Sequence, residues 1–198
     1  QAPYLIFVDD DCIPTPHLIE AFMKKARPGL VQLGQTTCKD GIRNPFDHAP
    51  ENPKGEEWFS CNFSMEREAF HRLGGFDEGF LKYGFEDYDF FRRCKDNALT
   101  IAPNIEASVD HPPRPSGKAF AGLQNQMNHY RYLLKYGEHP RLTETLRVTL
   151  GFAKARLKIP CGLPTKLRYL AHTLWRIILT IAYYDRLVAQ AKRSLRIL

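Results

Sequence analysis

The pattern of apolar and polar positions along the chain predicts strands and helices in alternation. Residues 4–8 form an apolar run on both faces, which is typical of a buried parallel strand in the centre of a sheet. A second strand is predicted at 30–36, and strict alternation over 58–65 predicts a half-buried strand with a polar face. The remaining predicted elements are helices at 15–27, 66–73 and 86–96 and short strands at 99–102 and 106–109.

Beyond His111 the pattern changes to a proline-rich loop followed by helices. Leucine and isoleucine recur every three or four residues over 163–181, which predicts an amphipathic helix. The 16 residues 169–184 contain one formal charge, but a helix needs about 20 apolar residues to span a bilayer. Basic residues flank this stretch, and it contains Trp175, Tyr183 and Tyr184, so we expect an interfacial helix. The alternative is a helix that packs on a partner subunit or on its own domain.

Together these elements predict an α/β fold with a partial Rossmann-like mixed sheet, flanking helices and a helical C-terminal extension. Residues 40–56 contain three prolines and two glycines, and a loop of this length is often a lid or a binding loop. We expect the sheet in residues 1–113, a loop and helices that close the domain in 114–162, and a basic amphipathic helical tail in 163–198.

The net charge of +6 is divided unevenly along the 198 residues. Residues 1–113 carry 12 Lys/Arg and 19 Asp/Glu, whereas 114–198 carry 16 and 3, which gives balances of −7 and +13. The acidic part suits a metal site, and the basic part suits an anionic partner such as phospholipid or a nucleotide diphosphate. Because the aromatic residues of the basic part lie at the spacing of a helix core, we do not expect a nucleic-acid partner.

The five cysteines are scattered and never form a Cys-x-x-Cys pair. Their odd number and spacing argue against a disulfide framework and a zinc site, and indicate a reducing compartment. Together with the basic tail, this predicts a cytoplasmic protein that is peripheral to the membrane.

Two short acidic clusters indicate a metal-dependent site. Residues 9–11 are all aspartates and follow the strand at 4–8, and open α/β sheets hold their ligands at the carboxyl ends of strands. Carboxylates packed side by side repel one another unless a cation neutralises them. The second cluster, at 86–89, opens a predicted helix after Gly84. The two clusters therefore point to a metal and a phosphate-bearing substrate.

Three motifs carry a resemblance to a known enzyme family: Val-Asp-Asp-Asp-Cys-Ile-Pro at 8–14, Gly-Gly-Phe-Asp-Glu at 74–78 and Gly-Phe-Glu-Asp-Tyr-Asp at 84–89. In this order they resemble the galactosyltransferase-like C-terminal portion of family 2 glycosyltransferases of the GT-A fold. The resemblance implies an inverting, metal-dependent glycosyltransferase of the hexosyltransferase type. Members of that family begin earlier, with a strand–helix–strand unit that binds the nucleotide base. We therefore expect a chain that is truncated at its N-terminus and inactive as this fragment alone.

The resemblance also implies roles for the residues of the donor site. Asp9 would touch the donor's ribose, and Asp11 would bind a divalent cation that bridges the diphosphate, with Asp9 close to the same metal. His111 would be the last metal ligand, and Arg114 and Lys118 would hold the diphosphate. Oxygen ligands and a diphosphate favour Mn²⁺ or Mg²⁺.

The first acidic cluster has two alternative interpretations. Its aspartates could cap a helix, but Thr15 with the following proline already suits that position. Phosphatases of the haloacid dehalogenase type also place Asp-x-Asp after an apolar strand, but they require Thr or Val where this chain has Ile13.

By the same resemblance, Asp87 would be the general base that deprotonates the acceptor hydroxyl, and Glu86 would bind or orient the acceptor. The alternative is that acids in a first helical turn only complement the helix dipole, which is the role we expect for Asp89. Trp58 and Asn62 lie on the polar face of the predicted strand, so we expect them to bind the acceptor through stacking and an amide. The alternative for Trp58 is packing under the long loop.

The predicted function is glycosyl transfer from a nucleotide-diphospho-sugar to a hydroxyl of a glycan or lipid-linked acceptor, with an anionic membrane surface as a further partner. The alternative is a non-catalytic remnant that binds a membrane or a partner through its basic helical tail.

Overall fold

The computed structural model describes residues 2–81, 84–115 and 119–195 and divides the chain into two compact units. Each unit is assembled from separated stretches of sequence. The first contains Gln1–Gly41, Ala49–Asp77 and Asp87–Arg114, and the second contains Ile42–His48, Glu78–Glu86 and Pro115–Leu198.

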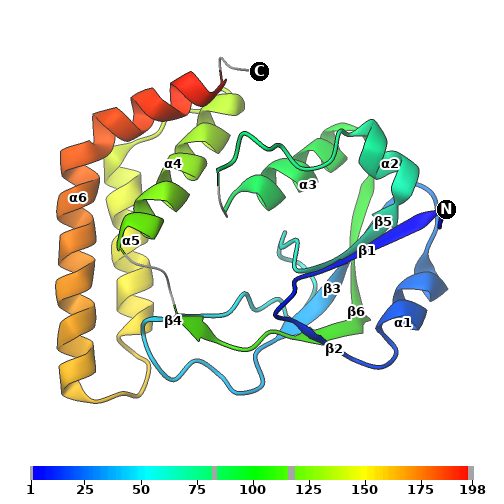
Figure 1. Cartoon of the computed structure of the whole chain (residues 1–198), viewed down its shortest axis with the longest axis horizontal. Coiled ribbons are helices and arrows are strands. Elements are labelled where there is room, and N and C mark those ends of the chain that lie inside the picture. Colours follow the sequence, from blue (N-terminus) through cyan, green and yellow to red (C-terminus); the bar gives the residue numbers. More distant parts are fainter. Residues whose placement is uncertain (1, 82–83, 116–118, 196–198) are drawn as a thin grey trace. The chain divides into compact units, whose positions relative to one another are not determined.

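A mixed five-stranded sheet forms the centre of the first unit, which confirms the predicted α/β class (Figure 1). The parallel pair β3–β6 lies in its interior, and all other pairings are antiparallel. Since a parallel pair aligns the carboxyl ends of its strands, the ends of β3 and β6 lie at the same edge of the sheet. Across the sheet the strands are β1 (Tyr4–Val8), β5 (Asn62–Glu66), β3 (Leu30–Thr37), β6 (Thr100–Asp110) and β2 (Ile13–Pro14).

The prediction of a central parallel strand at 4–8 was wrong, because β1 lies at one edge of the described sheet and pairs antiparallel with β5. The apolar run has a different cause. Phe7 stacks on Phe63 on one face, at 4.3 Å between ring centroids, while Ile6 packs against Leu18 and its neighbours on the other. Both faces of the sheet are covered, so a strand at its edge is also apolar on both sides.

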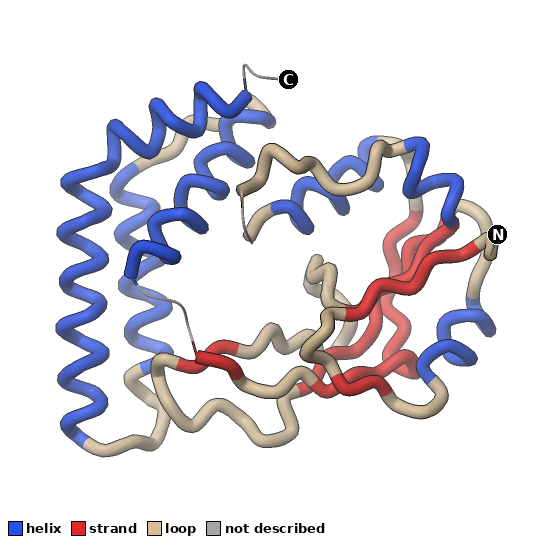
Figure 2. The backbone as a smooth tube through the Cα atoms, in the orientation of Figure 1, coloured by secondary structure: helices blue, strands red, loops and turns tan. Residues whose placement is uncertain are grey.

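Helices flank this sheet on two sides, as Figure 2 shows. The helix α3 (Glu86–Asp96) has the predicted bounds, and α2 (Arg67–Arg72) ends before Gly74 and Gly75, both at positive φ, as predicted. The helix α1 (Leu18–Lys25) begins later than predicted, with His17 rather than Thr15 at its N-cap. The two short strands predicted at 99–109 form the single strand β6.

A close approach of backbone and side chain explains the glycine in β3. The Asn62 amide donates to the carbonyl oxygens of Gln35 and Ala107 at 2.8 and 2.9 Å, directly beside Gly34. A Cβ at Gly34 would overlap the Asn62 amide and lie 2.6 Å from the Ala107 oxygen.

We therefore expect Gly34→Ala to lower the free energy of unfolding by about 1–3 kcal/mol, because Asn62 would have to shift and lose these hydrogen bonds. Chemical denaturation measures the loss. The matched control is Gly151→Ala in α5, where no atom lies within 4 Å of the new Cβ, and a small gain of about 0.5–1 kcal/mol is expected from the more rigid helix. Equal stability of the two variants would contradict this account.

Three helices form the core of the second unit: α4 (Ala119–Lys135), α5 (Leu142–Arg156) and α6 (Leu163–Leu195). Met127 and Tyr130 of α4 pack against Leu179 and Leu187 of α6, and the Thr180 hydroxyl donates to the Gln126 amide oxygen at 3.1 Å. A short two-stranded sheet pairs β4 (Asp47–His48) with β7 (Arg114–Pro115).

Candidate metal centre and active site

The sheet brings Asp11 and His111 together although they are 100 positions apart in the sequence. A turn follows β1, in which the Cys12 amide donates to the Asp9 carbonyl at 3.1 Å, and it leads into β2. Since Ile13 of β2 pairs with Asp110 of β6, the turn lies beside the residue that follows β6. The backbone N–H of His111 donates to the Thr37 carbonyl at 2.7 Å, which fixes the histidine at the end of the parallel pair.

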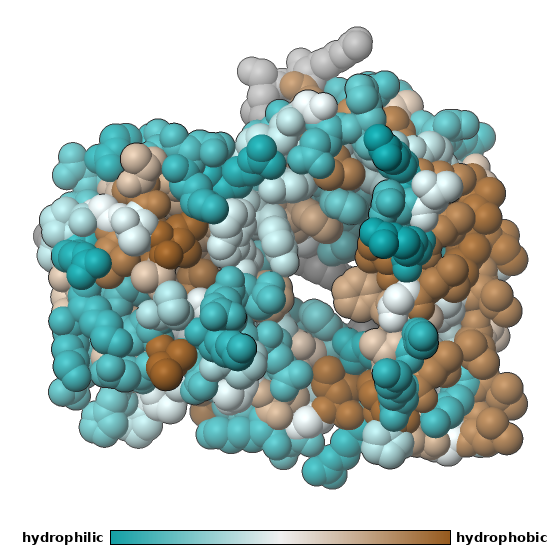
Figure 3. Space-filling view, turned by 180° about the vertical axis from the view of Figure 1, so that it is seen from behind, coloured by the Kyte–Doolittle hydropathy of each residue, from teal (hydrophilic) through white to brown (hydrophobic). Residues whose placement is uncertain are grey.

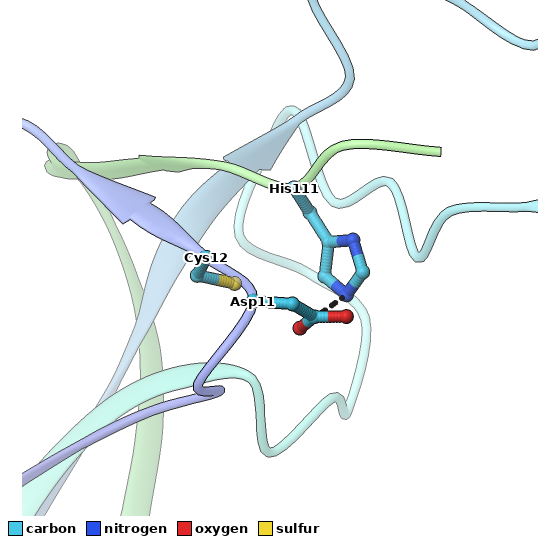
Figure 4. Close-up of side chains that lie close together, drawn as sticks. All are labelled: Asp11, Cys12 and His111. Carbon is cyan, nitrogen blue, oxygen red and sulfur yellow. Dashed lines mark ion pairs between the residues drawn. The ribbon is translucent and has the colours of Figure 1, made fainter. Parts of the chain in front are cut away.

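The Asp11 carboxylate and the His111 imidazole point toward each other, with Oδ1 and Nε2 3.3 Å apart (Figure 4). His111 is fully buried, and neither of these two atoms makes a hydrogen bond among the described residues. The other ring nitrogen, Nδ1, lies 3.0 Å from the Pro112 carbonyl oxygen, which can only accept, so Nδ1 carries the proton of this bond. If the imidazole is neutral, two acceptors face each other. A metal ion between them, or a second proton on the imidazole, would satisfy both atoms.

Cys12 completes a group of three side chains whose ligand atoms lie within 4.8 Å of one another. Sequence reasoning missed this residue, although its position next to Asp11 was a usable signal. Hydrogen bonding to Cys61 and burial raise the pKa of the Cys12 thiol, so it stays protonated at neutral pH. A protonated thiol is a poor ligand for a hard cation, which leaves Asp11 and His111 as the better donors.

Asp9 and Arg114 lie beside this pair. The structure therefore brings together four of the predicted donor-site residues: Asp9, Asp11, His111 and Arg114. Arg114 donates to Asp11 Oδ2 at 2.7 Å and thereby balances part of its charge. Burial and the Asp11 charge raise the pKa of Asp9, while His111 and Arg114 oppose this rise. The predicted Lys118 lies outside the described residues.

Glu86 and Asp87 stand at the start of α3, where both side chains are half-buried. Gly84 and Phe85 precede them with φ of 106° and 71°, and a Cβ at Gly84 would overlap the Asn125 amide, so this turn requires glycine. The Asp87 carboxylate accepts from the backbone N–H of Tyr88 at 2.8 Å, which holds it at the tip of the helix.

Asp89 has a structural contact that differs from the expected complement to the helix dipole. It is fully buried and forms an ion pair with Arg93 at 2.8 Å. The Arg93 guanidinium also donates to the carbonyl oxygens of Leu73 and Gly75, and so ties the end of α2 to α3.

The prediction that Asn62 lies on an accessible polar face was wrong. The polar face of β5 is covered by α1, and Asn62 is 2% exposed, with its amide nitrogen bonded to backbone carbonyls. Nearby, the Gln32 amide donates to the Phe22 carbonyl of α1 and to Ser64, so this face forms a buried polar network. The alternation that suggested a binding surface instead reflects polar groups that bond one another inside the protein.

Trp58 lies before β5 rather than within it, and its indole packs on the core beside α3. Its ring centroid is 6.4 Å from that of Tyr88, the neighbour of Asp87, and the Lys95 ammonium lies 5.5 Å from its ring. It lines a pocket of about 430 Å³ with Leu33 and Ile101. Its role in acceptor binding stays a prediction.

A model of a known protein family matches part of the chain. Residues 44–109 match a family model described as the N-terminal domain of galactosyltransferase. The match supports a glycosyltransferase-like domain in this chain. It includes Trp58, Glu86 and Asp87, begins after the aspartates at 9–11 and ends just before His111. A comparison with curated protein sequences gave no significant match. The resemblance to family 2 and the expected N-terminal truncation stay predictions.

Proposed function

We propose that the protein is a metal-dependent, inverting glycosyltransferase of the hexosyltransferase type. It transfers a sugar from a nucleotide-diphospho-sugar to a hydroxyl of a glycan or a lipid-linked acceptor. The family match over residues 44–109 supports glycosyl transfer in general. The observation that carries the finer proposal is the Asp11–His111 pair, whose facing atoms lie 3.3 Å apart and make no hydrogen bond among the described residues.

The two side chains fit a divalent cation. A carboxylate oxygen suits Mg²⁺ and Mn²⁺, whereas an imidazole nitrogen suits transition metals, so the mixed pair favours Mn²⁺. Metal-binding histidines usually donate their second N–H to a carbonyl or carboxylate, as His111 does toward Pro112. A bound divalent cation would supply Lewis-acid stabilisation of the diphosphate leaving group.

Asp9 and Arg114 have complementary tasks in this proposal. Asp9 is partly buried beside Asp11 and would accept a hydrogen bond from the donor's ribose when it is ionised. Arg114 pairs with Asp11 through one nitrogen, and half of its side chain is exposed. Its planar guanidinium has five N–H donors, so it can hold a phosphate oxygen as well as the carboxylate.

Asp87 is the proposed general base and Glu86 the proposed acceptor-binding residue. The hydrogen bond from Tyr88 N–H orients the Asp87 carboxylate, which takes the proton of the acceptor hydroxyl in this proposal. The proposed inverting reaction is a single in-line displacement, with Asp87 as the base on the acceptor side and the diphosphate as the leaving group. Trp58, beside Tyr88, is the proposed stacking surface for an acceptor sugar.

A reducing, cytoplasmic location is also part of the proposal. All five cysteines are free thiols, although Cys12 and Cys61 lie close enough to interact. Free cysteines at such positions are typical of proteins kept under reducing conditions.

Release of nucleoside diphosphate tests this function directly. The protein in its full natural length is incubated with a panel of nucleoside diphosphate hexoses and with glycan or polyprenyl-linked acceptors, with Mn²⁺ or with a chelator. We expect release with one donor class, stimulated by acceptor and lost with the chelator. Release that the chelator leaves unchanged would remove the metal from the mechanism, and no release with any donor would overturn the proposed activity.

A further inference from the structure

The helix α6 presents two different faces. One face packs on α4 through Leu179, Leu187 and Ala191, which are buried. The other carries the apolar stripe predicted from the sequence, and this stripe is exposed. We call it the α6 stripe, and its members are Leu163, Leu167, Leu170, Leu174, Ile178 and Ile181, which are 39–68% exposed.

The α6 stripe consists of leucine and isoleucine side chains, which are usually buried, and yet all six are exposed. Its members recur every three or four residues, so they follow one side of the helix for about five turns, or about 27 Å. Figure 3 shows hydrophobic side chains gathered along the edge that α6 forms. Soluble proteins rarely leave so long an apolar surface without a partner. The alternative of packing on the chain's own domain therefore holds for the opposite face of α6, which packs on α4, whereas the stripe is exposed among the described residues.

The surroundings of the α6 stripe are strongly basic. Residues 142–195, which form α5, α6 and their connection, contain ten Lys/Arg and two acidic residues, Glu144 and Asp185. Trp175, 51% exposed, follows Leu174 directly and so lies about 100° around α6 from it, at the flank of the stripe. An indole ring, with its apolar body and polar tip, prefers the boundary between lipid and water.

From this combination we infer that the α6 stripe docks on the surface of an anionic lipid membrane. The stripe enters the boundary between head groups and acyl chains, and the surrounding Lys and Arg side chains attract the acidic head groups. Charge favours lipid over a second copy of this chain, since a dimer through α6 would bring together two segments, residues 142–195 of each copy, that each carry an excess of eight positive charges. Among the described residues, no helix is long and apolar enough to cross a membrane.

Co-sedimentation with vesicles tests the inference. The intact protein should bind vesicles that contain phosphatidylserine more tightly than vesicles of phosphatidylcholine alone, and added salt should weaken this binding. Ile178→Glu removes an inserted side chain and adds a charge of the same sign as the lipid, so we expect the vesicle partition coefficient to fall about tenfold or more.

The matched control is Ile19→Glu, which places the same charge on an exposed isoleucine of α1. Ile19 is 67% exposed and Ile178 is 55% exposed. This variant should bind like the wild type. Point variants are preferable to removal of α6, because α6 supplies half of the core it shares with α4. Both substituted positions are exposed, so both variants should unfold at the wild-type temperature.

Three outcomes would overturn the inference: equal binding to acidic and neutral vesicles, unchanged binding of the Ile178 variant, or a dimer in light scattering that only this substitution dissociates. The last outcome would assign the α6 stripe to a second copy of the chain. Vesicle binding needs no sugar transfer, so its failure and the failure of the proposed activity are separate results.

Discussion

Replacing Asp11 by alanine is expected to abolish Mn²⁺-dependent sugar transfer and to weaken binding of Mn²⁺ itself. The substitution removes the carboxylate that faces His111 at 3.3 Å and leaves the imidazole as the single strong donor of the group. A bound metal contributes several kcal/mol to the stabilisation of developing charge, so the transfer rate should fall by about a thousandfold or more. Calorimetric titration with Mn²⁺ alone measures the binding defect without knowledge of the sugar donor.

Asp10 provides the control for this experiment. It lies in the same turn, but its side chain is exposed and it does not belong to the metal-binding group. Asp10→Ala should therefore bind Mn²⁺ and transfer sugar almost like the wild type. If Asp11→Ala retained wild-type affinity for Mn²⁺, the metal assignment would be wrong. Asp11 and a protonated His111 would then form an ordinary ion pair.

Replacing Asp87 by asparagine is expected to lower the transfer rate by about 10²–10⁴-fold while donor binding changes little. Asparagine keeps the shape of the side chain, and its oxygen can still accept from the Tyr88 N–H that holds Asp87 at 2.8 Å. What it loses is the ability to take a proton from the acceptor hydroxyl. The measurement is kcat with saturating donor and acceptor, together with the donor's KM.

Asp96 offers a matched control at the opposite end of the same helix, where its side chain is exposed. Asp96→Asn changes the charge of α3 by the same amount without touching the proposed base, so its kcat should match the wild type. A transfer rate near the wild-type value in Asp87→Asn would give Asp87 a purely structural role at the helix start.

Local signals in the sequence predicted the elements whose ends are set by neighbouring residues. The helix α3 has the expected bounds because acids at its start and basic residues at its end suit the helix dipole. The strand β3 was also predicted to within one residue. By contrast, the direction and place of β1 depend on which strand it pairs with, and an apolar run contains no such information.

The candidate site shows the same limit. The resemblance brought Asp11 and His111 into one metal site, but their contact depends on the pairing of Ile13 with Asp110, which joins distant parts of the chain. Asn62 looked accessible because alternation reveals which residues share a face and not what covers that face. The apolar side of α6 was likewise predicted, whereas its exposure could be known only from the packing of the opposite side on α4.

The interleaving of the two units has a consequence for the order of assembly during synthesis. The chain passes between the units after residues 41, 48, 77, 86 and 114, and the three large helices of the second unit come last. Chains emerge from the ribosome N-terminus first, so the sheet that carries Asp11 and His111 is complete before α4 is made. Ile42–His48 and Glu78–Glu86 belong to the second unit but are synthesised before its three helices. Until those helices are made, the two segments lack their packing partners. We therefore expect a nascent-chain chaperone to bind the chain most strongly during this interval.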